Sequence, residues 1–300
     1  MSNIILEKRK IFKKGVTVGT LIVFSRIFGF IRDLLLASYF GVSSSIEAFF
    51  VAQRIPNVWR GIFGEGAVNS TFVPVFSKLV GNKKYLFRVF SSSFIVVTFL
   101  VSVVCFLGSY YAPFIIKVIA PGLDLAAFTL CTEITQKIFF YLVIISVYTN
   151  FMGILFSFHF FNSSYLGPVF GNILFILGIL ISINFFKDSI NGLVIFFLLS
   201  GILHIIVQIP SLIKIGWRFY FPRNFGEIFL PEVRQIAKLL FQRMLIFSVY
   251  YINIFLDTIF ASLYWIVGQG GIGTLYYACL LYTSDAADEG LGVDLGGRRI

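Results

Sequence analysis

The chain has 300 residues, of which 58% are hydrophobic and only 13% are charged. A soluble domain usually carries about 25% charged residues. This composition, with a mean hydropathy of +0.92, therefore excludes an ordinary soluble globular domain. The formal net charge of +10 would suggest a nucleic-acid partner in a soluble protein. Here the Lys and Arg residues fall mostly in short segments between apolar runs, as in membrane proteins with positive loops on one side. We predict an all-α polytopic membrane protein that binds no nucleic acid.

The apolar runs predict seven membrane spans and the beginning of an eighth, after a basic lead-in at residues 1–13. Each complete run has the roughly 20 residues that a helix needs to cross a bilayer. The spans are expected at residues 14–40, 46–79, 89–111, 125–158, 165–185, 192–213 and 237–263, and the eighth begins near residue 270.

The cations of the predicted loops gather on one side of this topology. Nearly all of them lie in the lead-in and in the loops at 78–88 and 214–238, whereas the opposite loops hold Lys117, Lys187 and little else. The positive-inside rule then predicts a cytoplasmic N-terminus.

Three units follow from this topology. They are a six-span lobe at residues 14–213, a cytoplasmic linker at 214–236 and the start of a second lobe at 237–278.

The first two predicted spans carry an unusual number of charges. A charged side chain at the bilayer centre costs roughly 2.5–3.5 kcal/mol on insertion scales, so these groups should face a protein interior or a water-filled cavity. Arginines outnumber acids, and guanidinium groups match phosphate oxygens through paired hydrogen bonds. The stretch predicts a pocket for an anion such as a diphosphate. Internal pairing of the arginines with the acids is the alternative, and some pairing is expected. The charges are Arg26, Arg32, Asp33, Glu47, Arg54, Arg60 and Glu65.

Two pairs of these arginines are six residues apart, a spacing that does not put both members on one face of a straight helix. A bend between the members could bring them together. Gly29 and Pro56 lie at these places, and both are predicted hinges.

The cysteines and histidines give no sign of a metal site or of a disulfide framework. Cys105 and Cys131 lie inside apolar runs, where a free cysteine behaves as a small hydrophobic residue. His159 and His204 have no partner at metal-ligand spacing.

The composition changes abruptly at Cys279, where the sequence continues CLLYTSDAADEGLGVDLGGRRI. This segment resembles the translation of a sequencing adapter. We therefore expect residues 279–300 to be non-native, and the native protein to continue beyond Ala278.

Several motifs carry a family resemblance. SRIFGFIRD, EAFFVAQRIPNVWRGIFGEGA and FVP in the first two spans, with LDTIFAS and LYYA further on, resemble the MurJ (MviN) family of bacterial lipid II flippases. The similarity covers residues 14–278 in span order. It implies a MOP-superfamily fold of fourteen spans in two six-helix lobes plus a terminal pair, of which this chain would hold about seven or eight. It also implies a transporter, not an enzyme, in the bacterial cytoplasmic membrane. The implied activity moves an undecaprenyl-diphosphate-linked peptidoglycan precursor to the outer leaflet by alternating access.

The resemblance assigns roles to individual residues. In the family a further arginine follows the YYA motif, but in this chain that position falls within residues 279–300, which we expect to be non-native. The only cofactor that the resemblance implies is a sodium ion. The assigned residues are Arg26, Arg32 and Arg60 for the diphosphate, Asp33, Glu47 and Glu65 as cavity or gating acids, and Asp257 as a possible sodium ligand, with Arg54 undecided.

Other interpretations stay open at this stage. Another MOP exporter could move drug cations or oligosaccharide-lipids, although a drug-cation exporter should have an acid-rich cavity. An integral-membrane enzyme acting on a polyprenyl phosphate should show paired acids or a metal cluster. A truncated chain could also be inactive.

Overall fold

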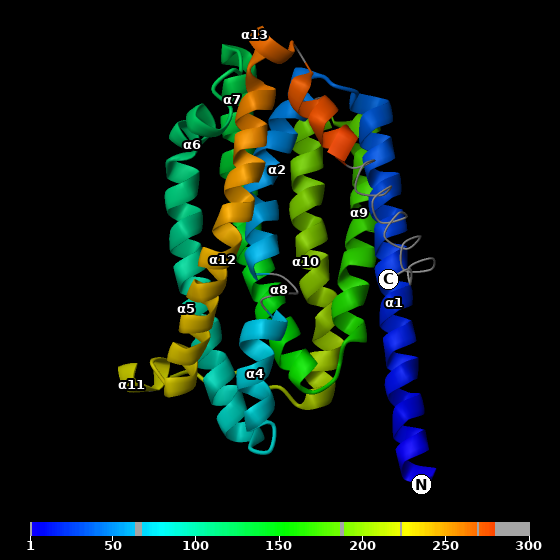
Figure 1. The fold of residues 1–300 in the computed structure, drawn as a ribbon, viewed down its shortest axis with the longest axis vertical. Helices are drawn as coiled ribbons and strands as arrows, with labels where there is room; N and C mark the ends of the chain where they lie inside the picture. The colour runs from blue at the N-terminus through cyan, green and yellow to red at the C-terminus, as the bar shows by residue number, and fades with distance from the viewer. Residues whose placement is uncertain (1, 64–67, 187–188, 223, 269, 280–300) are drawn as a thin grey trace, which may run out of the picture.

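The computed structural model describes residues 2–63, 68–186, 189–222, 224–268 and 270–279. Within these ranges the chain forms helices and turns, with no strand. The long helices run side by side as one elongated bundle, and the N-terminal part of α1 projects beyond it (Figure 1). The expected all-α fold is confirmed.

The helices follow the predicted order of spans and include several short additional segments. Residues 271–279 form a last helix, called helix 271–279 below. The elements are α1 (Ser2–Phe40), α2 (Ser44–Phe63), η1 (Val68–Phe72), α4 (Val73–Phe76), η2 (Ser77–Leu79), α5 (Lys83–Tyr110), α6 (Ala112–Ile119), α7 (Leu125–Ile138), α8 (Phe140–Ser157), α9 (Asn162–Phe185), α10 (Ser189–Ile215), α11 (Phe225–Ile228), α12 (Pro231–Ser262) and α13 (Tyr264–Val267).

Four helical segments of the described chain are long and apolar enough to cross a membrane, and a fifth qualifies if α12 is taken as one bent span. The four are α5, α7 with α8, α9, and α10. The other two expected spans correspond to α1 and α2, the helices that carry the unusual charges. α2 holds Glu47, Arg54 and Arg60 within its 20 residues.

Several predicted boundaries were wrong, each for a local reason. α5 begins six residues before the predicted start, because the Asn82 side chain accepts a hydrogen bond from the backbone N–H of Tyr85 at 3.2 Å and caps the helix. α12 begins at Pro231, inside the predicted linker. The predicted loop after α5 contains α6, which has Pro113 in its first turn. Proline is well tolerated there, since the N–H groups of a first turn have no helical partner.

The helix of the predicted second span does not break at the predicted hinge Pro56. α2 continues through Pro56 and ends at Phe63, and the short segments η1, α4 and η2 complete the run to Leu79. Residues 64–67 of this span lie outside the described residues.

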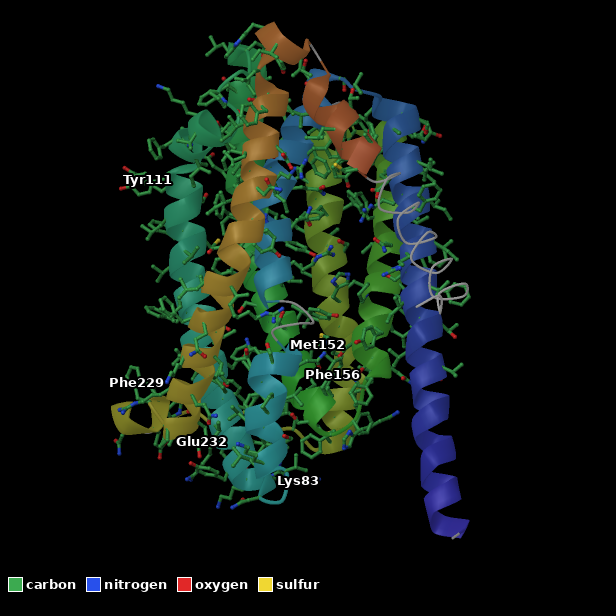
Figure 2. All side chains as sticks on the ribbon, viewed as in Figure 1. Lys83, Tyr111, Met152, Phe156, Phe229 and Glu232 are labelled. Carbon is green, nitrogen blue, oxygen red and sulfur yellow. The ribbon has the colours of Figure 1, made fainter. Side chains whose placement is uncertain are left out.

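The core is rich in phenylalanine and lies between α2, α5, α8 and the segments after α2. Figure 2 shows Met152 and Phe156 of α8 inside the bundle and Tyr111 at its outer edge. The outer faces of α1, α5, α9 and α10 expose large apolar side chains, as expected for helices that face lipid. The largest fully buried core side chains include Phe49, Phe50, Phe72, Phe76 and Phe90.

The loops that were predicted to be cytoplasmic lie together. The described connections at residues 80–82, 216–222 and 224–230 fall in the predicted loops 78–88 and 214–238, and they lie at the end of the bundle from which the N-terminus projects, as does the turn at residues 158–161 (Figure 1). We call this the basic end, because Lys78, Lys83, Lys84, Arg88, Lys214 and Arg218 are located there. Its cytoplasmic orientation remains a prediction.

Glycines allow α9 and α10 to approach closely. A Cβ atom at Gly178 would lie 2.3 Å from the Cβ of Phe196, and one at Gly171 would lie 2.2 Å from Nε2 of His204. Small residues let membrane helices pack at short range in this way. His204 is thus a buried packing residue in this bundle.

We predict that Gly178→Ala destabilises the bundle by about 1–3 kcal/mol, the usual cost of an overpacked core. The readout is the midpoint of thermal unfolding in detergent. Gly19→Ala is the matched control, since nothing lies within 4 Å of a Cβ placed there. Equal midpoints for the two variants would contradict the close packing of α9 on α10.

Candidate functional site

Arg32 and Asp33 form an ion pair on the inner side of α1. Nη2 of Arg32 lies 2.7 Å from Oδ1 of Asp33, and Nε of Arg32 donates a hydrogen bond to the same oxygen at 2.8 Å. The Asp33 side chain is only 4% exposed and that of Arg32 is 26% exposed. Internal pairing, the alternative considered from the sequence, therefore holds for Arg32.

Asn172 of α9 extends this pair into a connection between two helices. Nη1 of Arg32 donates to Oδ1 of Asn172 at 3.1 Å, and Nδ2 of Asn172 donates to the backbone oxygen of Ser25 at 3.0 Å. Gly29 lies opposite this amide, since a Cβ atom there would be 3.5 Å from Nδ2. Three hydrogen bonds engage the guanidinium, which has five N–H groups, so two remain for another acceptor.

Two arginines of α2 join Arg32 around a tyrosine of helix 271–279. Tyr276 lies within electrostatic range of Arg32, Arg54 and Arg60, and its ring stacks on Phe50 at 3.9 Å between centroids. Within the described chain, Arg54 and Arg60 have no ion-pair partner, and the buried Nε of Arg54 makes no hydrogen bond. The result is a cluster of three guanidinium groups with one paired carboxylate, and the Asp257 carboxylate of α12 also lies within electrostatic range of Arg54.

The arginine cluster differs from the set expected from the sequence. Arg32 and Arg60 belong to it, and so does Arg54, which the sequence left undecided. Arg26 is exposed on α1 and is not among the charges near Tyr276. Tyr276 itself was missed. Its only sequence signal was its place in the LYYA motif, since an aromatic residue in a span looks like lipid-facing surface.

Glu47 lies at the other end of α2, away from the basic end, and is 1% exposed. Its Oε1 accepts hydrogen bonds from the backbone N–H groups of Ile272 at 2.9 Å and Gly273 at 3.1 Å. These are the first N–H groups of helix 271–279, where a carboxylate also interacts favourably with the helix dipole. Glu47 therefore joins helix 271–279 to α2.

Tyr264 of α13 completes this contact. Its hydroxyl donates to Oε2 of Glu47 at 3.3 Å. Burial, together with the nearby Glu47 carboxylate, raises the pKa of Tyr264 to about 12, so the hydroxyl keeps its proton at neutral pH. Three donors from two segments thus meet at the Glu47 carboxylate.

The other candidate residues are less engaged. Asp257 is exposed on α12 and lines an open hollow of about 510 Å³ together with Thr274. No group of three or more His, Cys, Asp or Glu residues in the described part of the chain could hold a metal ion. Pro56 is buried within α2, and Glu65 lies outside the described residues.

A bundle with four or five described segments that are long and apolar enough to cross a membrane is that of an integral membrane protein, and in this one three arginines lie around Tyr276. The family model "Lipid II flippase MurJ" matches residues 36–284, and the chain belongs to this family. The match extends a few residues into the segment that was expected to be non-native.

Among curated relatives, the probable lipid II flippase MurJ of Buchnera aphidicola subsp. Schizaphis graminum is 31% identical over 89% of this chain and 52% of its own length. That of Aquifex aeolicus is 30% identical over 91% of this chain and 53% of its own.

Solved structures agree with this assignment. A structure described as "Lipid II flippase MurJ, inward closed conformation" has a TM-score of 0.75 and 28% identity, over 89% of this chain and 54% of that one. An inward-facing MATE-family multidrug transporter of the MOP superfamily has a TM-score of 0.63 at 18% identity, a likeness of fold alone. The chain spans about half the length of the curated relatives that it matches.

We predict that Glu47→Ala frees the start of helix 271–279. Hydrogen bonds to a charged group contribute about 1.5–3 kcal/mol, so amide exchange at Ile272 and Gly273 should become roughly 10- to 100-fold faster. Glu47→Gln keeps an acceptor oxygen without the charge and should give an intermediate rate. Hydrogen–deuterium exchange measures both, with Glu133→Gln on the exposed face of α7 as the control. Unchanged exchange in Glu47→Ala would show that the contact does not hold this helix.

Proposed function

We propose that this chain is the first half of a lipid II flippase, together with the start of its second half. The substrate is the undecaprenyl-diphosphate-linked peptidoglycan precursor. It moves from the inner to the outer leaflet of the bacterial cytoplasmic membrane by alternating access, and the N-terminus is cytoplasmic. Membership of the lipid II flippase MurJ family supports this proposal. The observation that carries it is the arginine cluster around Tyr276, in which only Arg32 has a carboxylate partner within the described chain.

The chemistry of a diphosphate suits this arrangement. Guanidinium groups stay charged and bind phosphate oxygens through two parallel hydrogen bonds. Asp33 and Asn172 hold the Arg32 guanidinium in one orientation, and its two remaining N–H groups are available to the ligand. Arg54 and Arg60 add charge from a second helix. A site held in place before binding loses less side-chain entropy when the ligand arrives.

Arg26 belongs to the proposed pathway at a different step. It lies six residues before Arg32, which is about 9 Å along α1 toward the basic end. A diphosphate that enters from that end would meet Arg26 before it reaches the arginine cluster.

The Glu47 contact fits the closed end of an alternating-access cycle. It joins α2 to helix 271–279 at the end opposite the basic end. Release to the outer leaflet would require this contact to open, with Gly29 and Pro56 as proposed hinges and Glu65 as a further gating acid. A sodium ion at Asp257 would need ligands in addition to this carboxylate and the Thr274 hydroxyl.

The other classes fit less well. The likeness to a MATE transporter is one of fold. A drug-cation exporter would use acids with no internal partner, whereas the two buried acids here, Asp33 and Glu47, are already hydrogen-bonded, and the charges around Tyr276 are mainly arginines. No covalent step is proposed for this protein.

We predict that Arg60→Ala and Arg32→Ala each weaken lipid II binding by about 10- to 100-fold, since a hydrogen bond to a charged group contributes about 1.5–3 kcal/mol. Binding to the chain in nanodiscs can be followed by native mass spectrometry. Lys117→Ala is the control, because Lys117 is an exposed cation of α6 at the opposite end. Undecaprenol, which lacks the diphosphate, should bind all variants alike. If both arginine variants bind lipid II as the unsubstituted chain does, the assigned site is wrong.

A further inference from the structure

A polar hollow of about 410 Å³ lies at the basic end, far from the arginine cluster. α5 contributes Lys84, Arg88 and Ser92 to its wall, and the segment between α10 and α12 contributes Tyr220 and Glu227. Figure 2 shows Lys83, at the start of α5, and Glu232, at the start of α12, at this end of the bundle.

The charges in this hollow favour an anion. Lys84 and Arg88 are four residues apart and therefore share one face of α5. Both are exposed, and neither makes an ion pair with a described residue. They lie near the N-terminus of a 28-residue helix, whose dipole adds positive potential. Of the nearby acids, Glu232 accepts a hydrogen bond from the Tyr85 hydroxyl at 3.1 Å, and Glu227 is the one carboxylate among the wall residues given for the hollow.

A second hollow continues along α5 from this point. It has a volume of about 290 Å³ and lies between α5 and α12, with Trp59 of α2 on its wall. Its lining is almost entirely apolar, and the Ser93 hydroxyl donates to the backbone oxygen of Phe90 at 2.9 Å. From Ser93 to Val104 the groove follows α5 for about 16 Å. One leaflet of a bilayer has a hydrocarbon depth of about 15 Å.

The two hollows adjoin each other along α5. Ser92 lines the polar one and Ser93 the apolar one, and Val233 of α12, in the apolar groove, lies three residues after Leu230, the N-cap residue of that helix, which lines the polar hollow. A basic opening thus leads into a groove as deep as one leaflet. Aromatic residues beside the opening, such as Tyr220, are typical of the membrane–water interface.

We propose that this continuous site binds one anionic glycerophospholipid. Its phosphate lies against Lys84 and Arg88, and one acyl chain lies between α5 and α12. Because α5 belongs to the first lobe and α12 follows the connecting segment, a bound lipid would hold the two together. This site is separate from the arginine cluster and does not depend on which substrate the protein transports.

Trp59 provides a direct test, since it lines the acyl-chain groove. The chain is placed in phosphatidylcholine nanodiscs that contain a small fraction of phosphatidylglycerol with brominated acyl chains, which quench nearby tryptophan. The fluorescence of Trp59 is obtained by subtracting the fluorescence of the Trp59→Phe variant from that of the unsubstituted chain. We expect brominated phosphatidylglycerol to quench it at least threefold more strongly than brominated phosphatidylcholine at the same mole fraction.

Variants separate the headgroup from the chain. The double variant Lys84→Gln and Arg88→Gln should abolish the preference for phosphatidylglycerol, whereas Lys78→Gln with Arg218→Gln, two exposed cations of the same end outside the hollow, should keep it. Ala237→Phe fills the groove and should reduce quenching by both lipids.

Four results would overturn the proposal. The first is equal quenching of Trp59 by the two lipids, and the second is a preference for phosphatidylglycerol that survives the Lys84 and Arg88 substitutions. The third is loss of this preference when soluble glycerol phosphate is added. The fourth is displacement of phosphatidylglycerol by an equimolar amount of undecaprenyl phosphate. The third would identify a free phosphate as the ligand, and the fourth a prenyl chain.

Discussion

The structure depends on one constraint, which is that a charge within a membrane helix must be sheltered by protein or water. Arg32 and Asp33 satisfy it by pairing with each other at 2.7 Å on the inner face of α1, and Asn172 attaches that pair to α9. Because an unpaired charge facing lipid would be costly, the pair also fixes which side of α1 turns inward. Arg54 and Arg60 of α2 then face the same region, around Tyr276.

The same constraint explains the contact at the other end of the bundle. Glu47 is buried, and its side chain accepts hydrogen bonds from the first N–H groups of helix 271–279 and from Tyr264, while no cation of the described chain pairs with it. This contact joins α2 to helix 271–279 through hydrogen bonds alone. The basic end shows the opposite arrangement, because Lys84 and Arg88 are exposed beside the polar hollow.

Much of the fold could be predicted from the sequence, because apolar length and loop charge are strong signals for membrane helices. The fold class, the order of the spans and the gathering of basic loops at one end were correct. The predicted helix starts were wrong where a single local residue sets the start. Asn82 caps α5 through its side chain, and Pro113 and Pro231 lie in the first turns of α6 and α12. For the site, sequence spacing could find charged residues but not their partners. Nothing in the sequence links Arg32 to Asn172, or Glu47 to Gly273, because these contacts join distant segments.

The most direct test of the arginine pocket is the reactivity of a cysteine placed within it. In a bilayer, Arg60→Cys should react with a water-soluble, membrane-impermeant thiol reagent, and lipid II should slow that reaction while undecaprenol does not. Leu34 lies on the lipid-facing side of α1 and is 49% exposed, so a cysteine in its place should stay unreactive. A cysteine at position 60 that does not react, or whose reaction lipid II leaves unchanged, would contradict a water-filled pocket that binds the lipid diphosphate.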